Sequence, residues 1–195
     1  MWKVARSFMA AAVAAAGLVI TCTPVSAQPP PPCDFVTGGG FVITNLGAEG
    51  NFGAHAGCKL RAFWGHVNYV DHGGFLETTQ YHVSSIAVTG YLKIAPNVRD
   101  ICGIALTNAD EPQPVHFRVR MVGDGESGTP EAFGIRLSNG YLVKLRVLGD
   151  GGPGGGHIQL HQSNPSSKGP NPVPDEGTMC AGLTPPVSGS IIDAP

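Results

Sequence analysis

Apolar and polar side chains alternate along residues 115–148, and this period of two constrains the fold more than any other feature of the chain. The first run sets four apolar residues against three polar ones: Val115, Phe117, Val119 and Met121 against His116, Arg118 and Arg120. Successive side chains of a strand point to opposite faces, so this run predicts a half-buried β-strand. The alternation recurs in residues 133–138 and 141–147, and Asn139-Gly140 between them is a strong hairpin signal. The whole stretch therefore predicts a three-stranded antiparallel meander with one apolar face.

Strand-like segments at short intervals also precede and follow the meander. They cover residues 35–44, 60–72, 81–95, 98–108 and 157–161, and turns rich in Gly, Pro and Asn separate them. The glycines at 38–40 indicate either a bulge or a place where another backbone comes close. Residues 45–57 are rich in Gly, Ala and Asn and are interpreted as a loop, with a short strand at Asn51-Phe52 as an alternative. The pattern predicts an all-β fold, specifically an antiparallel β-sandwich, with a small closed β-barrel as the alternative.

The long segment 81–95 offers two candidate faces. Its even-numbered set is the more apolar and is therefore predicted to face the core: Ser84, Ile86, Val88, Gly90, Leu92 and Ile94. No amphipathic helix of ordinary length is predicted anywhere after residue 28, which agrees with an all-β fold.

The N-terminus has the features of a targeting segment. Lys3 and Arg6 precede an apolar run at residues 8–20, and Val25-Ser26-Ala27 offers small residues before a cleavage point. The apolar run is short for a membrane anchor. Lipidation at Cys22 is a further alternative, which Thr21 disfavours. We predict a signal peptide at 1–27, a Pro-rich linker at 28–32, a β domain at 33–162 and a flexible Pro/Gly-rich tail at 163–195, disordered except where Cys180 holds it.

Cleavage after Ala27 would leave 168 residues, enough for one domain with a substantial core. It would also leave 10 Lys and Arg against 14 Asp and Glu, a net charge of −4. A mildly acidic chain without a basic cluster is a poor nucleic-acid binder, and no later apolar run is long enough to span a membrane. The expected location is secreted or periplasmic.

The predicted mature chain contains four cysteines, Cys33, Cys58, Cys102 and Cys180. An even number in an exported chain predicts two disulfides, and four cysteines allow three pairings. We favour Cys58–Cys102, because both flank the predicted sheet, with Cys33–Cys180 joining the tail to it. The absence of a Cys-x-x-Cys pair argues against a zinc site.

Several strings in this order resemble the post-COAP domain family, a group of exported bacterial β-rich modules. They are the segments at residues 33–41, 51–53, 64–72, 101–103, 124–128, 133–137 and 154–161, and together they span about residues 33–164. Two positions depart from the usual family forms Asp-Gly-Glu-Pro-Gly and Gly-Gly-Gly-Asn-Ile-Gln, namely Ser127 and His157. The resemblance implies a β-rich fold and export, and it implies no particular activity.

Histidines and acidic residues are the candidates for site chemistry. His66, Asp71 and His72 lie on one predicted strand, and a carboxylate can orient an imidazole, so they form a possible polar or metal site. His157 and His161 form a second candidate pair. Calcium prefers oxygen-rich loops, so three acidic residues in Gly-rich turns are candidate calcium ligands: Asp124, Glu126 and Asp150. The ordinary interpretation is a set of polar-face histidines and acidic turn residues, with no cofactor.

Trp64 and Tyr69 are the candidate binding aromatics, because exposed rings on a strand could stack on a sugar or a protein partner. Core packing is the ordinary alternative. Without a Gly-x-Ser-x-Gly motif or a complete phosphate loop, the sequence predicts a non-catalytic secreted interaction or structural module. The alternative is a small secreted hydrolase or a metal-dependent site built on His66, Asp71 and His72.

Overall fold

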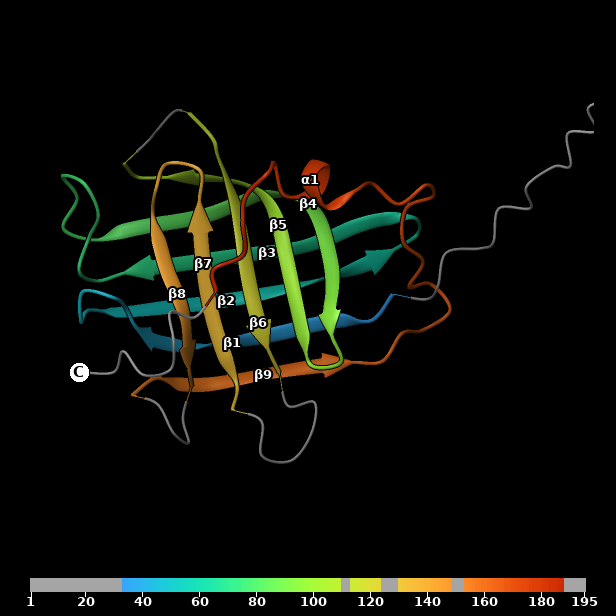
Figure 1. The fold of residues 1–195 in the computed structure, drawn as a ribbon, viewed down its shortest axis with the longest axis horizontal. Coiled ribbons are helices and arrows are strands. Elements are labelled where there is room, and N and C mark those ends of the chain that lie inside the picture. The colour runs from blue at the N-terminus through green and yellow to red at the C-terminus, as the bar shows by residue number, and fades with distance from the viewer. Residues whose placement is uncertain (1–32, 110–112, 124–129, 149–152, 188–195) are drawn as a thin grey trace, which may run out of the picture.

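The computed structural model describes residues 33–109, 113–123, 130–148 and 153–187, and these residues form an all-β antiparallel fold with one short helix (Figure 1). The strands are β1 (Phe35–Ile43), β2 (Glu49–Lys59), β3 (Ala62–Asp71), β4 (Tyr81–Ala95), β5 (Val98–Thr107), β6 (Val115–Val122), β7 (Ala132–Leu137), β8 (Leu142–Val147) and β9 (Gly155–His161), and the helix is α1 (Glu176–Met179). All nine strands belong to one sheet of order β8-β7-β6-β5-β4-β3-β2-β1-β9. The predicted fold class is confirmed.

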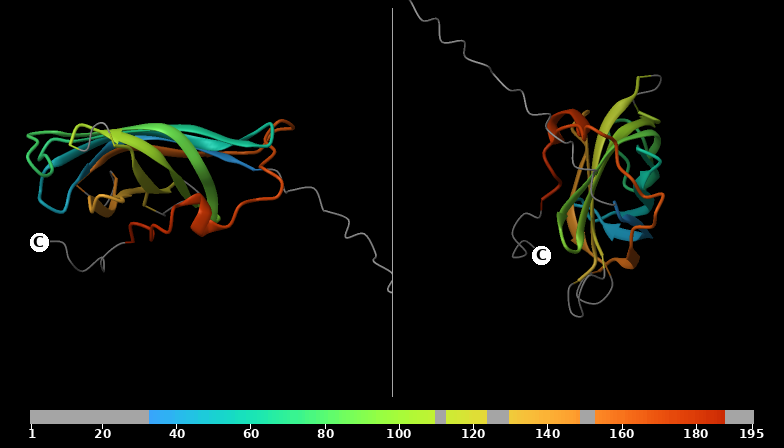
Figure 2. Two further views of the ribbon diagram at one scale, coloured as in Figure 1. Left: turned by 90° about the horizontal axis from the view of Figure 1, so that it is seen from above. Right: turned by 90° about the vertical axis from the view of Figure 1, so that its right-hand side faces the viewer.

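This sheet curls over itself, so that β7 and β8 lie across the inner face of β1, β2 and β3 (Figures 1 and 2). The ring of Phe52 in β2 stacks on that of Phe133 in β7, with centroids 3.9 Å apart. The two layers of the predicted sandwich are therefore halves of one continuous sheet. Among the described residues, the edges of the sheet meet through one isolated bridge, Leu148–Gly154, so the sheet is curled and not a closed barrel.

Strand β4 forms the corner between the two layers. It pairs with β3 only near its start, between residues 81–84 and 68–71, and with β5 from residue 83 to residue 95. Its pairing with β5 contains three register shifts, which bend a strand and change which residues face inward. The predicted core face of β4 is wrong over most of the strand, because the odd-numbered residues face the core before the first shift, and only Val88 of the even-numbered apolar residues packs against the main core. Val83 and Tyr91 are buried, whereas Ile86 and Ile94 are 59% and 42% exposed.

The predicted meander is confirmed as β6, β7 and β8. Its predicted apolar face forms much of the core, including Val115, Phe117, Val119, Met121, Phe133, Ile135, Leu137, Tyr141 and Val143. The prediction of a loop at residues 45–57 is wrong for most of the segment, because β2 occupies residues 49–57 of it. Ala54 and Ala56 face the core there, and their small side chains suit the narrow space between two packed layers.

The glycines at 38–40 mark a close approach of β9 to β1. A Cβ atom on Gly40 would lie 2.1 Å from the Gly155 carbonyl oxygen, and one on Gly156 would lie 2.3 Å from the Gly39 oxygen. The register between β1 and β2 is unbroken through these residues, so the bulge alternative is not realised.

The C-terminal segment, residues 163–187, follows the body of the fold, and Cys180 joins it to the sheet as the sequence suggested. It lies against the outer face of the sheet, where α1 contacts β4 (Figure 2). Met179 and Cys180 are buried, and the Thr89 hydroxyl donates a hydrogen bond of 2.6 Å to the Met179 carbonyl. The Cys102–Cys180 disulfide and the apolar contact of Met179 join the segment to the sheet. The predicted signal peptide, the linker and residues 188–195 lie outside the described residues.

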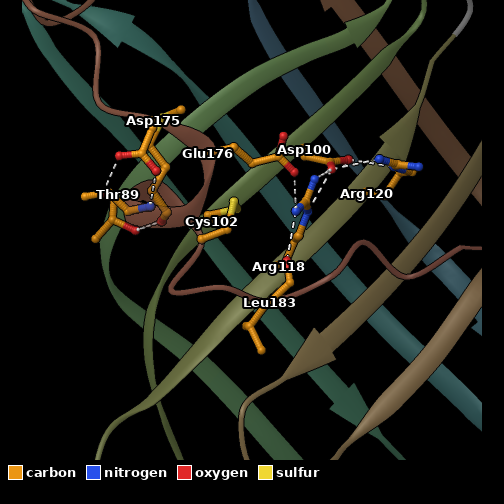
Figure 3. The surroundings of a disulfide bond; sticks show 11 residues. Thr89, Asp100, Cys102, Arg118, Arg120, Asp175, Glu176 and Leu183 are labelled. Carbon is orange, nitrogen blue, oxygen red and sulfur yellow. Dashed lines mark hydrogen bonds and ion pairs between the residues drawn. A yellow bond between two sulfur atoms is a disulfide. The ribbon is translucent and has the colours of Figure 1, made fainter.

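The disulfides are Cys33–Cys58 and Cys102–Cys180, so the favoured pairing is wrong. Residues 35 and 57 are direct partners in the β1–β2 register, which brings Cys33 and Cys58 together at the end of that hairpin. The side chain of Cys102 points away from the sheet interior, toward the C-terminal segment (Figure 3). The path of that segment, and not proximity to the sheet, selects Cys180 as its partner.

Candidate functional site

Five aromatic and imidazole rings lie side by side on the outer face of β9, β1, β2 and β3. We call this set the ring platform: His161, Phe35, Trp64, His55 and His66. The ring centroids of His161 and Phe35 are 4.3 Å apart, and those of Phe35 and Trp64 are 6.0 Å apart. The centroid of His55 lies 5.6 Å from that of Trp64 and 6.3 Å from that of His66. His55 is exposed and the other four are half-buried, so the rings form a surface that a ligand can reach.

The platform follows from the strand register. One row of directly paired residues crosses four strands: His161, Phe35, Gly57 and Trp64. A Cβ atom on Gly57 would lie 2.5 Å from the Cβ of Phe35, so the glycine leaves the space in which the rings of Phe35 and Trp64 approach each other. The next row on the same face consists of Gln159, Thr37, His55 and His66. The rings are therefore flanked by an amide, a hydroxyl and imidazoles.

Alternation along the strands explains why these rings face outward. Ala54 and Ala56 flank His55, and Val67 follows His66, and all three of these neighbours are buried in the core. Because adjacent side chains in a strand point to opposite faces, the rings must lie outside. The Thr37 hydroxyl also hydrogen-bonds the Nε2 atom of His161 at 2.9 Å, which holds one end of the platform.

A partly buried ion pair anchors the backbone just before Phe35. The Asp34 carboxylate accepts hydrogen bonds from Arg99 Nε at 2.9 Å and from the Tyr91 hydroxyl at 2.8 Å, and Arg99 Nη2 forms an ion pair with it. Burial by itself raises the pKa of the Asp34 carboxyl, but the hydrogen bonds from Arg99 and Tyr91 and the Arg99 charge together lower it below its usual value. This contact ties the start of β1 to β4 and β5, and the Cys33–Cys58 disulfide ties it to β2.

The stability difference between the wild type and an Asp34→Asn variant is expected to shrink as the pH falls below about 4. The pKa of Asp34 is lower in the folded state, so the stability from its ionised form is present above the unfolded-state pKa. It is lost as the pH falls through the folded-state pKa. Urea unfolding of both proteins at pH 7, 5, 4 and 3 measures this. Profiles that stay parallel over the whole range would contradict it.

The predicted His66, Asp71 and His72 site does not form. Asp71 points into the core, where its carboxylate accepts a hydrogen bond of 2.6 Å from Tyr141 and one of 2.8 Å from the Gly73 backbone N–H. His72 lies between Asn51 and Gln80, with contacts of 2.8 and 3.1 Å. Six residues along a strand correspond to about 20 Å, so His66 and His72 cannot share one ligand.

The other predicted ligands are also dispersed. Nδ1 of His157 lies 2.7 Å from the Glu131 carboxylate, whereas His161 stacks on Phe35. Within the described residues, no group of three or more His, Cys, Asp or Glu is arranged to hold a metal ion. The three candidate calcium ligands, Asp124, Glu126 and Asp150, lie outside the described residues.

Of the two candidate binding aromatics, the structure keeps Trp64 at the surface and buries Tyr69. The Tyr69 side chain is fully buried, with its ring 6.0 Å from that of Phe133, and its hydroxyl oxygen lies 2.9 Å from the hydroxyl oxygen of Tyr141. Burial raises the pKa values of both tyrosines. The prediction that Tyr69 is a binding aromatic is therefore wrong. Sequence reasoning missed Phe35 and His55 as platform members, and His55 lay in the segment predicted as a loop.

Comparison with known proteins assigns neither a family nor a function to this chain. No family model, no curated protein and no solved structure matches the chain. The resemblance to the post-COAP family therefore stays an expectation from the sequence. Among the described residues, no helix has the length and apolar character needed to cross a membrane.

Proposed function

We propose that this protein is an exported, non-catalytic binding module that holds a neutral glycan on the ring platform. The observation that carries the proposal is the row of rings across four strands, with Trp64 and Phe35 beside each other at its centre. Export is supported by the two disulfides, which persist in oxidising compartments, and by the predicted signal peptide. The hydrolase alternative loses support because His66, Asp71 and His72 do not converge.

The chemistry of the platform suits a sugar. An aromatic ring presents an apolar face that can cover the C–H groups of a pyranose, and polar side chains beside it can exchange hydrogen bonds with the hydroxyls. The second row supplies such groups in Thr37, Gln159 and His55. The two rows contain no Asp, Glu, Lys or Arg, so a charged ligand has no complementary charge there. Four strands span about 14 Å, which fits a short oligosaccharide better than a single sugar ring.

A glycan array followed by isothermal titration calorimetry tests this proposal. Wild-type protein is expected to bind at least one neutral oligosaccharide. Trp64→Ala is expected to weaken that binding by about 2 kcal/mol, or roughly thirtyfold, because a central tryptophan usually dominates an interface.

Phe41→Ala is the matched control, since Phe41 lies on the same strand and face as Phe35 but beyond the platform. It should bind the oligosaccharide as the wild type does. Circular dichroism would verify that both variants are folded. Failure of every neutral oligosaccharide to bind, or equal affinity in Trp64→Ala and wild type, would rule the proposed surface out.

A further inference from the structure

We propose that His55 and His66 form a two-imidazole site for a divalent transition-metal ion, with Cu²⁺ bound more tightly than Ni²⁺ or Zn²⁺. The two residues are direct partners in the β2–β3 register, and both side chains lie on the outer face of the sheet. This pair differs from the set His66, Asp71 and His72 that the sequence suggested. It does not rest on the proposed glycan function.

The separation of the two rings fits one shared ion. Each imidazole nitrogen binds a metal at about 2.0–2.1 Å and lies just over 1 Å from its own ring centroid, so two ligating rings have centroids roughly 5–6.5 Å apart. The centroids of His55 and His66 are 6.3 Å apart, with their planes at 43°. Rotation of the exposed His55 side chain is therefore enough to complete the site.

A buried serine already orients His66. The hydroxyl oxygen of Ser85 lies 3.0 Å from Nδ1 of His66 and accepts a hydrogen bond of 2.8 Å from the Val67 backbone N–H. Metal-bound histidines usually give their second ring N–H to such an oxygen, which fixes the ring and leaves the other nitrogen for the ion. With Nδ1 of His66 directed at Ser85, Nε2 is the atom available for a metal. The Ser85 contact thus supplies the outer-shell partner that a ligating histidine needs.

The ligand set selects the class of ion. Two neutral imidazoles suit Cu²⁺, Ni²⁺ and Zn²⁺, with Cu²⁺ the strongest of these, whereas Ca²⁺ and Mg²⁺ require oxygen ligands. Because His55 is exposed, water can fill the remaining coordination positions. Imidazole must be unprotonated to bind, so the affinity should fall in acid.

Trp64 provides a local reporter for this site. The chain contains two tryptophans, Trp2 and Trp64, and Trp2 lies in the predicted signal peptide. The rings of Trp64 and His55 are 5.6 Å apart, so a paramagnetic Cu²⁺ ion on His55 should quench Trp64 emission. Exported protein is titrated with CuSO₄ in a non-chelating buffer at neutral pH. We expect saturable quenching at one equivalent, and an electron paramagnetic resonance spectrum with two imidazole nitrogens on the copper.

Single substitutions separate this pair from the other histidines. His55→Gln and His66→Gln should each weaken Cu²⁺ binding at least tenfold, and Ser85→Ala by about tenfold because it removes the outer-shell partner. His161→Gln, within the same platform, and His72→Gln, beyond it, should bind as the wild type does. Quenching that does not saturate, or that survives either His55→Gln or His66→Gln, would overturn the proposal.

Discussion

Replacing Asp100 with asparagine is expected to lower the free energy of unfolding by about 3–5 kcal/mol. Asp100 is fully buried on the outer side of β5, and its carboxylate is shared between two arginines of β6 (Figure 3). Arg118 donates to Oδ2 from Nε at 2.9 Å and from Nη2 at 2.6 Å, and Arg120 donates to Oδ1 from Nε at 2.7 Å. The Arg118 side chain is only 3% exposed, so the substitution would leave a buried guanidinium without its main counter-ion.

The C-terminal segment is what removes this network from water. Arg118 Nη1 donates a hydrogen bond of 2.8 Å to the Leu183 carbonyl and forms an ion pair of 2.7 Å with Glu176 (Figure 3). Urea unfolding measures the loss, with Glu77→Gln as the control, because Glu77 is exposed and such changes usually stay within about 0.5 kcal/mol. A loss under about 1 kcal/mol for Asp100→Asn would mean that water reaches the arginines, and hence that residues 176–183 do not cover them.

Local sequence pattern predicted the strands whose apolar residues are large. The meander of β6, β7 and β8 follows the alternation of Phe, Ile, Leu and Val with polar residues, and Asn139-Gly140 lies in the turn between β7 and β8. Most of strand β2 was missed because its inward residues include Gly50, Ala54 and Ala56, which carry little hydrophobic signal. Gly50 is needed there because a Cβ atom would lie 2.1 Å from the hydroxyl of Tyr69. That requirement comes from a neighbouring strand, so no local pattern reveals it.

The candidate site was predictable only in part for the same reason. The alternation in residues 60–72 placed Trp64 and Tyr69 on opposite faces, but which face is the core depends on what packs against β3. The rings of Phe133 and Tyr141, more than 60 residues away in the chain, bury Tyr69 and leave Trp64 outside. Joining Phe35, Trp64 and His161 into one row requires the register of four strands, which the sequence does not display.

The polar face of the meander shows a further limit of sequence patterns. His116, Arg118 and Arg120 alternate with the core residues, which predicts a solvated face, and His116 is indeed exposed. Arg118 is buried because residues 163–187 cross that face, although the composition of this segment suggested disorder. The pairing of Cys102 with Cys180 depends on the same path.

Replacing both Cys102 and Cys180 with alanine is expected to cost about 4 kcal/mol of unfolding free energy. The two residues are 78 positions apart, so their disulfide removes much conformational entropy from the unfolded chain. Alanine is the suitable replacement because both sulfurs are buried against Met179. The matched control replaces both Cys33 and Cys58 with alanine. These two cysteines are only 25 positions apart, so the control should lose roughly 1 kcal/mol less unfolding free energy. Urea unfolding of the three proteins measures both losses.

The same variant should also uncouple the C-terminal segment from the Asp100 network. Without Cys102–Cys180, residues 176–183 are held on the sheet mainly by the Thr89 and Arg118 contacts, so water should reach Arg118 more often. Asp100→Asn should then cost about 1–3 kcal/mol less in the double-alanine background than in the wild type. Limited proteolysis should cut residues 163–187 of the variant first. Strict additivity of the two changes, together with unchanged proteolysis, would show that the disulfide does not hold the segment over the arginines.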